Sequence, residues 1–408
     1  MRTGTTEDLL RSLRPGERVF FQGGPGEVVA FFDALQNNPG LANRLDLWSC
    51  LIPGINARDY GSLANGHTLT TFMASLALEP SILSGRTRID AMPYSKIGTT
   101  LARMEFDVAV LHTAPPGSDG ECSFGLSCDM APLVWPNARR RVVFVNEQMP
   151  SLVHAESMPS EAIDLAIHIN EPLLSAPSLR QNSVVDAIAR RVAGLIPDGV
   201  TFQSGIGDTP AAITAALKLH RGLKVHSGII TNEYRLLAES GALDPEAEHI
   251  TGIAWGDQSF QAWLPNSEFH FRSALETHSH DHLAKIPDFY SIGSALEVDL
   301  AGNINLEWRM GRRVSSVGGA PDYMRGAAAS RGGRSIIALQ STAGGASRIV
   351  PALQSPSIPG GLVDMVVTEH GVAELRGLTG PARADALIAI AAPEHQAFLQ
   401  AARFNTRR

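Results

Sequence analysis

The stretch KVHSGIITNEY at residues 224–234 holds several side chains that could do chemistry. His226 and Ser227 are adjacent and could be a base and a nucleophile. Successive residues of a strand point to opposite faces, however, so these two side chains cannot easily bond to each other. Glu233 follows the apolar run. We expect it to be a solvated residue that starts the next helix, and the alternative is that its carboxylate turns back to act as a nucleophile.

A glycine-rich turn occurs in FQSGIGDTPAAITAAL, where an apolar run ends in Gly205-Ile206-Gly207 and a helical pattern begins. Glycine lets the backbone approach a ligand closely, and the free N–H groups at the start of a helix favour anions. Thr209 is the expected cap of that helix. The segment therefore predicts either an anion-binding loop or a tight turn without a ligand.

A second glycine-rich turn occurs in VSSVGGAPDYMRGAA, where Gly318 and Gly319 precede Asp322 and Arg325. Paired glycines can expose backbone amides to a developing oxyanion, which assists acyl transfer. The alternative is a loop held by a structural ion pair between Asp322 and Arg325. The residues alone leave both interpretations open.

Three carboxylates lie within or directly after apolar runs. Glu297 and Asp299 lie two apart in SALEVDLAGNINLE, so they share one face of a strand. We expect Asp299 to bind loop amides and hold the turn at Gly302, and Glu297 stays a catalytic candidate. Glu369 follows an apolar run in VVTEHGVAELRG, where a carboxylate would stand at the carboxyl end of a sheet.

The segment HSHDH at residues 278–282 concentrates histidine, which is a common metal ligand. Its histidines lack a helix-spaced pair and a following set of carboxylates. We therefore predict no metal site.

Composition excludes several classes of partner. The chain has 408 residues, 44% hydrophobic and 18% charged, with a net charge of −7. The only dense basic run is Arg139–Arg141, so neither nucleic acid nor a membrane surface is an expected partner. Three cysteines are too few for a disulfide scaffold, and no signal peptide or long apolar run is present. These features favour a cytoplasmic protein.

Short apolar runs alternate with helical patterns along the chain. Strands are predicted at 18–22, 106–113, 140–146, 201–207, 291–300, 334–342 and 364–371, and helices at 26–36, 183–196, 209–220 and 382–404. This alternation predicts an α/β fold with two sheets. The polar segment 171–183 is the expected boundary.

Taken together, the motifs resemble the acetyl-CoA hydrolase / 4-hydroxybutyrate CoA-transferase family. The resemblance rests on their order along most of the chain: FDVAVLHTAPPGSDGECSFGLSCD, VNEQMP, QSGIGDTPAAI, SALEVDLAGNIN, VGGAPDYMRGA, STAGGASRIVP and VVTEHGVAELRGLT. It implies two CoA-transferase-type α/β domains, 1–180 and 181–408, each a largely parallel sheet flanked by helices. It also implies an active site between them, acyl-CoA and a carboxylic acid as substrates, and a homodimer.

The resemblance further implies covalent catalysis, in which a glutamate attacks the thioester and carries first the acyl group and then CoA. In the family this glutamate stands in a segment of the form His-Thr-Glu-Met, and here the matching segment has Gly228 at its place. The retained candidates are Glu369 and Glu297, with Glu233 as a substitute nucleophile. Another option is a water at Gly228 that Glu369 activates, which would make the protein a hydrolase.

Backbone contacts to CoA are expected from residues of the two glycine turns and from Gly228; the residues are Gly205, Ile206, Gly207, Gly228, Gly318 and Gly319. The expected activity is CoA transfer or acyl-CoA hydrolysis with a short-chain acid. Two alternatives stay open. One is a catalytically altered paralogue that binds a CoA ester as a sensor or assembly subunit, and the other is a lyase or isomerase that acts on acyl-CoA.

Overall fold

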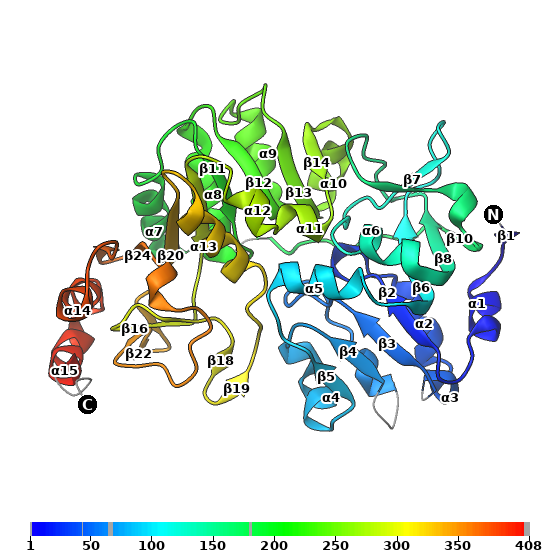
Figure 1. Ribbon diagram of the computed structural model, residues 1–408, viewed down its shortest axis with the longest axis horizontal. Helices are drawn as coiled ribbons and strands as arrows, with labels where there is room; N and C mark the ends of the chain where they lie inside the picture. Colours follow the sequence, from blue (N-terminus) through cyan, green and yellow to red (C-terminus); the bar gives the residue numbers. More distant parts are fainter. Residues whose placement is uncertain (1, 43, 64–67, 179–181, 404–408) are drawn as a thin grey trace. The chain divides into compact units, whose positions relative to one another are not determined.

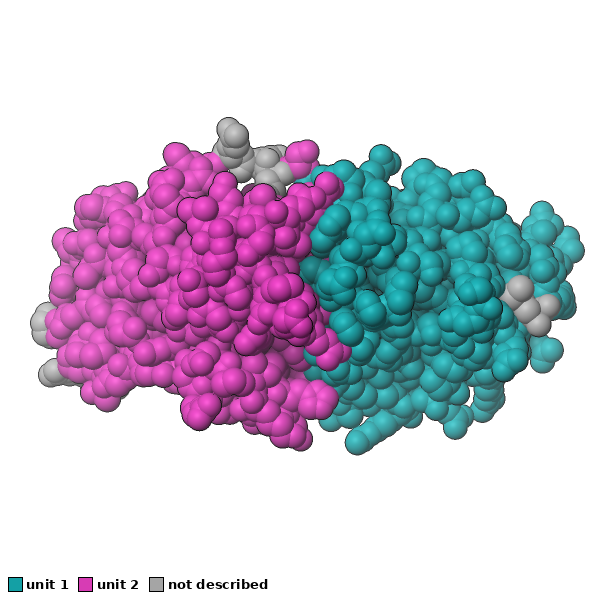
Figure 2. Space-filling model, turned by 90° about the horizontal axis from the view of Figure 1, so that it is seen from above, with its two compact units in different colours: residues 1–177, 250–277, 314–318 teal, residues 178–249, 278–313, 319–408 magenta. Residues whose placement is uncertain are grey.

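The computed structural model describes residues 2–42, 44–63, 68–178 and 182–403. These residues form two compact units, which Figure 2 shows in different colours. Unit 1 comprises residues 1–177, 250–277 and 314–318, and unit 2 comprises 178–249, 278–313 and 319–408. The chain therefore leaves and re-enters each unit. The proposed domains, 1–180 and 181–408, differ from the units in where they place 250–277 and 314–318, and they stay a prediction.

Unit 1 is built on an eight-stranded sheet (Figure 1). Its strands are β1 (Arg2–Thr3), β2 (Arg18–Phe21), β3 (Asp46–Ser49), β4 (Leu69–Thr71), β5 (Thr87–Ile89), β6 (Phe106–Thr113), β8 (Ala138–Asn146) and β10 (Leu165–Ile169). They lie in the order β1-β10-β8-β6-β2-β3-β4-β5, and every neighbouring pair is parallel. A parallel sheet is covered on both faces, which explains the continuous apolar runs in β6 and β8.

The remaining elements of unit 1 are shorter. The helices are α1 (Thr6–Ser12), α2 (Val29–Gln36), α3 (Pro39–Ala42), α4 (Glu79–Leu83), α5 (Tyr94–Leu101), α6 (Ala131–Val134), α10 (Gln258–Trp263) and α11 (Ala274–Thr277). Strands β7 (Glu121–Ser123) and β9 (Ser157–Pro159) form an antiparallel pair, and β13 (His249–Trp255) and β14 (Phe269–Phe271) lie largely within 250–277. In the core, Phe21 stacks on Tyr60 and packs against Phe31 at a tilt.

Unit 2 contains a second sheet, whose strands run in the order β12-β11-β15-β20-β24-β25 within this unit. They are β11 (Thr201–Ser204), β12 (Lys224–Thr231), β15 (Phe289–Gly293), β20 (Arg334–Ala338), β24 (Met365–Thr368) and β25 (Gly371–Glu374). All these neighbours are parallel except β24 and β25, which are antiparallel. The expectation of two largely parallel sheets is therefore confirmed.

The helices of unit 2 lie before, between and after its strands along the chain. They are α7 (Ser183–Ala193), α8 (Asp208–Ala216), α9 (Asn232–Glu239), α12 (His280–Leu283), α13 (Ala320–Ala329), α14 (Gly380–Ala389) and α15 (Pro393–Arg403). Helix α8 begins one residue earlier than expected, because Gly207, and not Thr209, is its N-cap. Gly207 has a φ of 117°, a conformation that favours glycine.

The run 291–300, expected to be one strand, is two. After β15 the chain leaves the sheet, and β16 (Glu297–Asp299) pairs with β17 (Ile304–Asn305) and β23 (Ile349–Val350) in a separate small sheet. The guanidinium of Arg348 donates to the carbonyls of Ala295 and Leu296, which bridges the break. Two further antiparallel pairs are β18 (Trp308–Arg309) with β19 (Arg312–Arg313), and β21 (Thr342–Ala343) with β22 (Ala346–Ser347).

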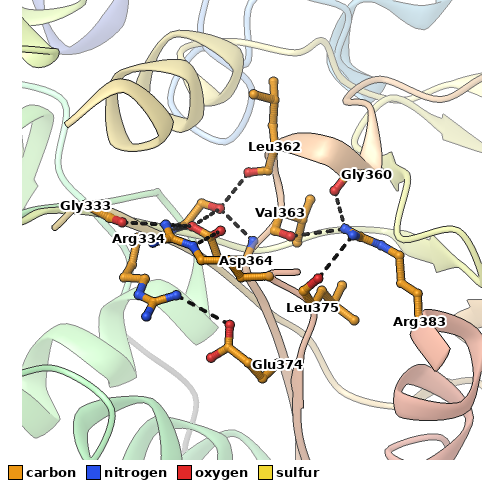
Figure 3. Close-up of polar contacts among 11 residues, drawn as sticks. Gly333, Arg334, Gly360, Leu362, Val363, Asp364, Glu374, Leu375 and Arg383 are labelled. Carbon is orange, nitrogen blue, oxygen red and sulfur yellow. Dashed lines mark hydrogen bonds and ion pairs between the residues drawn. The ribbon is translucent and has the colours of Figure 1, made fainter. Parts of the chain in front are cut away.

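Polar contacts around Asp364 anchor the start of β24 (Figure 3). Arg376 bonds both carboxylate oxygens of Asp364 at 2.8 Å, and the Ser335 amide donates to the same carboxylate at 2.9 Å. Figure 3 also shows Arg383 donating to main-chain carbonyls, among them that of Val363 at 3.1 Å. These bonds secure the strand that leads to Glu369.

No helix in the described part of the chain combines the length and apolar character needed to cross a membrane.

Candidate active site

The side-chain space at Gly228 is filled by two other residues. Gly228 lies in the middle of β12 and is partly exposed. A Cβ atom added there would lie 2.5 Å from Cε1 and 2.8 Å from Nε2 of His278, and 2.9 Å from Oη of Tyr323. Carbon atoms in favourable contact lie about 3.5–4.0 Å apart, so a side chain at 228 and the present position of His278 exclude each other. The position of the missing Cβ is therefore occupied by the His278 ring, so a water beside Gly228 would have to lie away from this point, and that hypothesis stays a prediction.

Gly319 makes room for the same imidazole. A Cβ added at Gly319 would collide with Nε2 of His278. Neither Gly228 nor Gly319 has a positive φ, so the absence of a side chain is required by space and not by backbone conformation. The His278 ring, 5% exposed, is therefore held against two glycines, far apart in the sequence.

Local structure explains how His278 and Tyr323 meet. His278 stands directly before Ser279, whose side chain accepts the His282 amide and caps α12. Tyr323 lies in the first turn of α13, where its amide donates to the carbonyl of Gly319 at 3.1 Å. Helices α12 and α13 pack together, and the centroids of the two rings are 4.7 Å apart.

An apolar cluster fixes the Tyr323 ring. Leu283, Phe289, Tyr323 and Ala327 form one buried core, and the Phe289 and Tyr323 ring centroids are 6.2 Å apart. Aromatic pairs at such distances contribute about 0.5–1.5 kcal/mol beyond the area they bury. The ring is thus held firmly, whereas its hydroxyl makes no hydrogen bond of normal geometry within the described residues, although the Gly228 amide lies near it.

Burial keeps both polar groups neutral. It lowers the pKa of His278 from its ordinary value to about 3, and the charge of nearby His226 acts in the same direction. Burial also raises the pKa of Tyr323 well above its usual value, with a further contribution from the charge of Asp322. At neutral pH His278 is therefore an uncharged imidazole, and Tyr323 retains its proton.

The other polar residues of the 224–234 segment are engaged locally. Ser227, next to His226 in β12, donates its hydroxyl to the carbonyl of Ile229 at 2.8 Å. Glu233 starts α9 as expected, but it is only 8% exposed, and the Thr231 hydroxyl donates to it at 2.5 Å. The expectation that Glu233 is solvated is therefore wrong, because Thr231 and the helix bury its carboxylate.

Glu369 lies far from Gly228 within the same sheet. Gly228 is on β12 and Glu369 follows β24, with β11, β15 and β20 between them. Neighbouring strands are about 4.8 Å apart, so the two residues are separated by roughly 19 Å. The carboxylate of Glu369 instead accepts the amide and hydroxyl of Ser341, at 2.9 and 2.6 Å. Glu369 cannot activate a water at Gly228, although a role elsewhere stays a prediction.

Glu297 and Asp299 lie on the small sheet. Asp299 accepts the amides of Ala301 and Asn303 at 3.0 and 2.9 Å and holds the turn at Gly302, whose φ is 81°. Its expected structural role is confirmed. Glu297 accepts the side-chain amide of Asn305 at 2.7 Å, and nothing in this arrangement tests its catalytic role.

A cavity of about 540 Å³ adjoins Asp299 in unit 2. Its charged lining residues are Asp299, Arg383 and Arg403. Arg403 pairs with Asp385, and Arg383 donates to the Val363 carbonyl. These charges are engaged within the fold, so we do not place the chemistry there.

The residues of the glycine turns differ in their surroundings. Gly205 donates its amide to Ile292 at 3.1 Å, and Ile206 is 40% exposed. Gly207 begins α8, as described above. Gly318 belongs to unit 1, has a φ of 55°, and accepts the Tyr94 amide at 3.0 Å. Gly319 contacts His278.

Sequence reasoning missed the two residues at Gly228. His278 opens the HSHDH segment and Tyr323 follows the paired glycines, but no spacing joins either residue to β12. Within the described residues, no three His, Cys, Asp or Glu side chains gather as metal ligands do. The available signal was a histidine among polar residues, which is typical of a surface segment.

Gly228→Ala should lower the free energy of unfolding by about 1–3 kcal/mol, because its Cβ overpacks against His278. The cost should shrink in a His278→Ala background, where the ring is gone. Gly205→Ala is the matched control, since its Cβ would meet Pro210 and the Ile292 carbonyl at ordinary distances of 3.7 and 3.9 Å. Chemical unfolding of the wild type, Gly228→Ala, His278→Ala and the double variant measures the coupling between the two positions. An equal loss of unfolding free energy from Gly228→Ala in both backgrounds would contradict the close approach of His278 to position 228.

The chain was compared with known proteins. The family model for the acetyl-CoA hydrolase/transferase N-terminal domain matches residues 89–191, and the model for the C-terminal domain matches 256–403. The 4-hydroxybutyrate coenzyme A transferase of Clostridium kluyveri is 29% identical over 409 residues, covering 96% of this chain and 94% of that protein.

Two further known proteins resemble this chain and support the same family. The butyryl-CoA:acetate CoA-transferase of Anaerostipes caccae is 30% identical and covers 71% of this chain and 69% of its own length. The crystal structure of RipA from Yersinia pestis superposes with a TM-score of 0.91 at 25% identity, covering 99% of this chain and 97% of that one. This chain belongs to the acetyl-CoA hydrolase/transferase family.

Proposed function

We propose that this protein is an enzyme that transfers CoA between carboxylic acids or hydrolyses acyl-CoA, and that its acid is short-chain. The observation that carries the proposal is the match to both domains of one family, in order, along most of the chain. Relatives named 4-hydroxybutyrate coenzyme A transferase and butyryl-CoA:acetate CoA-transferase support the substrate class. CoA enters as the substrate thioester.

Transfer and hydrolysis place different demands on the site. Transfer needs a group that holds the acyl unit and then CoA while the acids exchange, whereas hydrolysis needs only a positioned water. Gly228 cannot hold either group, because it has no side chain. Glu233 is a buried carboxylate in the helix that directly follows β12, so we propose it as the substitute nucleophile.

The glycine turns are proposed to contact CoA through their backbone. Gly205, Ile206 and Gly207 precede α8, and free amides at the start of a helix favour the anionic groups of CoA. Gly228, Gly318 and Gly319 are proposed as further backbone contacts. Glu297 and Glu369 are kept as catalytic candidates; the bonds between Glu369 and Ser341 suit a carboxylate that positions the loop 341–348.

The protein is further proposed to act in acetate metabolism in the cytoplasm, as a homodimer. Light scattering of the purified chain tests the assembly. A homodimer has twice the mass of one 43.6 kDa chain, and a mass equal to a single chain at micromolar concentration would contradict it.

The activity is tested by incubating the protein with acetyl-CoA, with and without butyrate. Release of free thiol without butyrate indicates hydrolysis, and formation of butyryl-CoA indicates transfer. We expect at least one of the two. Binding of acetyl-CoA without either reaction would contradict the proposal and favour the sensor interpretation.

Replacement of Glu233 by Gln tests the covalent route. If Glu233 carries the intermediate, Glu233→Gln should abolish butyryl-CoA formation, and hydroxylamine should no longer inactivate the enzyme in the presence of acetyl-CoA. Glu239→Gln, in the same helix and paired with Arg235, should leave both properties unchanged. Full exchange by the Glu233→Gln protein would remove Glu233 from the mechanism.

A further inference from the structure

Two hydrogen-bond donors converge on the backbone at Gly228. Nε2 of His278 and Oη of Tyr323 lie 2.8 and 2.9 Å from the same point, the position of the absent Cβ. The two atoms are therefore at most about 5.7 Å apart, a separation that allows both to bond one oxygen. Each belongs to a ring that its neighbours hold in place, so the pair is preorganised.

The Tyr323 hydroxyl donates to no acceptor among the described residues. It is buried and makes no hydrogen bond of normal geometry, although the backbone amide of Gly228 lies near enough to lower its pKa. A buried polar group without a partner costs about 1–3 kcal/mol, and in a native protein it calls for an explanation. A phenylalanine would fill the same space without that cost. A ligand atom that accepts the hydrogen bond would account for the hydroxyl.

The charge state of the pair suits a developing negative charge. A neutral imidazole donates through one ring nitrogen, which in this role is Nε2, and a protonated tyrosine donates through its hydroxyl; neither brings a charge that must be desolvated. The ionisable groups that face His278 are His226 of β12 and Tyr323 of α13. Donors that are already desolvated need little reorganisation when the thioester oxygen becomes an oxyanion.

We propose that His278 and Tyr323 are catalytic residues that together bind the thioester oxygen of the acyl-CoA beside Gly228 and stabilise its oxyanion. This inference rests on the proposed function and deepens it, because it applies to transfer and hydrolysis alike. Gly228 and Gly319 serve the pair by leaving space for the imidazole. In this account a side chain at 228 is absent because the donors need its place.

The chemical step is balanced without proton transfer from either donor. The oxygen of the nucleophile, a water or a carboxylate, bonds to the carbonyl carbon, and the π electrons move to the thioester oxygen. Collapse of this intermediate breaks the C–S bond and expels CoA as the thiolate. In hydrolysis, the thiolate takes up the proton that water loses, which yields the acid and free CoA.

Tyr323→Phe is the decisive variant, because it removes only the oxygen. Loss of one oxyanion donor lowers kcat by about 100- to 1000-fold, and we expect a fall of this size with little change in KM. The thermal midpoint should stay the same or rise, since the hydroxyl makes no hydrogen bond of normal geometry within the described residues. Tyr290→Phe, a second buried tyrosine of unit 2, is the matched control and should retain full kcat.

His278→Ala tests the second donor. We expect a similar fall in kcat and partial recovery when free imidazole occupies the space left by the ring. His280 is an exposed histidine of the same segment, and His280→Ala should leave kcat unchanged with and without imidazole. Recovery by imidazole separates a chemical role from a structural one. Unchanged kcat in Tyr323→Phe, or a fall in kcat that only follows a fall in the thermal midpoint, would overturn the inference.

Infrared spectroscopy supplies a readout that does not depend on turnover. With acetyl-CoA labelled with ¹³C at the carbonyl, two donors should shift the carbonyl stretch of the bound thioester to lower frequency in the wild type. Tyr323→Phe should reverse part of the shift, and an equal shift in both proteins would overturn the proposal that Tyr323 is one of the two donors.

If the wild type turns over acetyl-CoA and the variants have the same kcat, the inference alone fails. If the wild type neither binds nor turns over acetyl-CoA, the proposed function fails with it.

Discussion

The contact between the His278 imidazole and the backbone at Gly228 and Gly319 is the constraint on which the site depends. A side chain at either glycine would occupy the space of the ring. Burial of an imidazole is unfavourable in itself, because a polar group leaves water. The fold accommodates it against the Tyr323 ring, whose centroid lies 4.7 Å away, and the Tyr323 ring in turn packs against Phe289 at 6.2 Å. The result is a rigid, uncharged pair of donors beside a strand.

The order of the strands adds a second constraint. Parallel strands separate residues across a sheet by fixed steps, so Glu369 and Gly228 belong to different regions of unit 2. Glu297 lies on another sheet, and its carboxylate is bonded to Asn305. Of the three candidate carboxylates, only Glu233 is carried by the helix that follows β12. Its role as the nucleophile stays a proposal.

Much of the fold follows from local sequence patterns. The apolar runs 106–113 and 140–146 predict the buried strands β6 and β8, because a parallel sheet excludes water from both faces. The break in 291–300 was missed, since the side chain that bonds to it, Arg348, comes from a distant part of the chain. Family membership was predictable because many short motifs occur in the same order.

The candidate site was predictable only in part. The sequence shows that Gly228 lacks a side chain, but not what takes its place, because no local pattern links His278 to β12. The burial of Glu233 was missed for a similar reason, since it depends on how α9 packs. A polar residue next to a strand end is solvated or buried according to its tertiary neighbours, and these cannot be read from spacing.

The most direct test of the central claim is the position of a thioester oxygen in the site. A crystal structure of the protein with a non-hydrolysable acyl-CoA analogue that retains the carbonyl would locate this atom. We expect the carbonyl oxygen within hydrogen-bonding distance of both Nε2 of His278 and Oη of Tyr323, beside Gly228. A carbonyl oxygen bound elsewhere, with this pair unchanged and unoccupied, would contradict it.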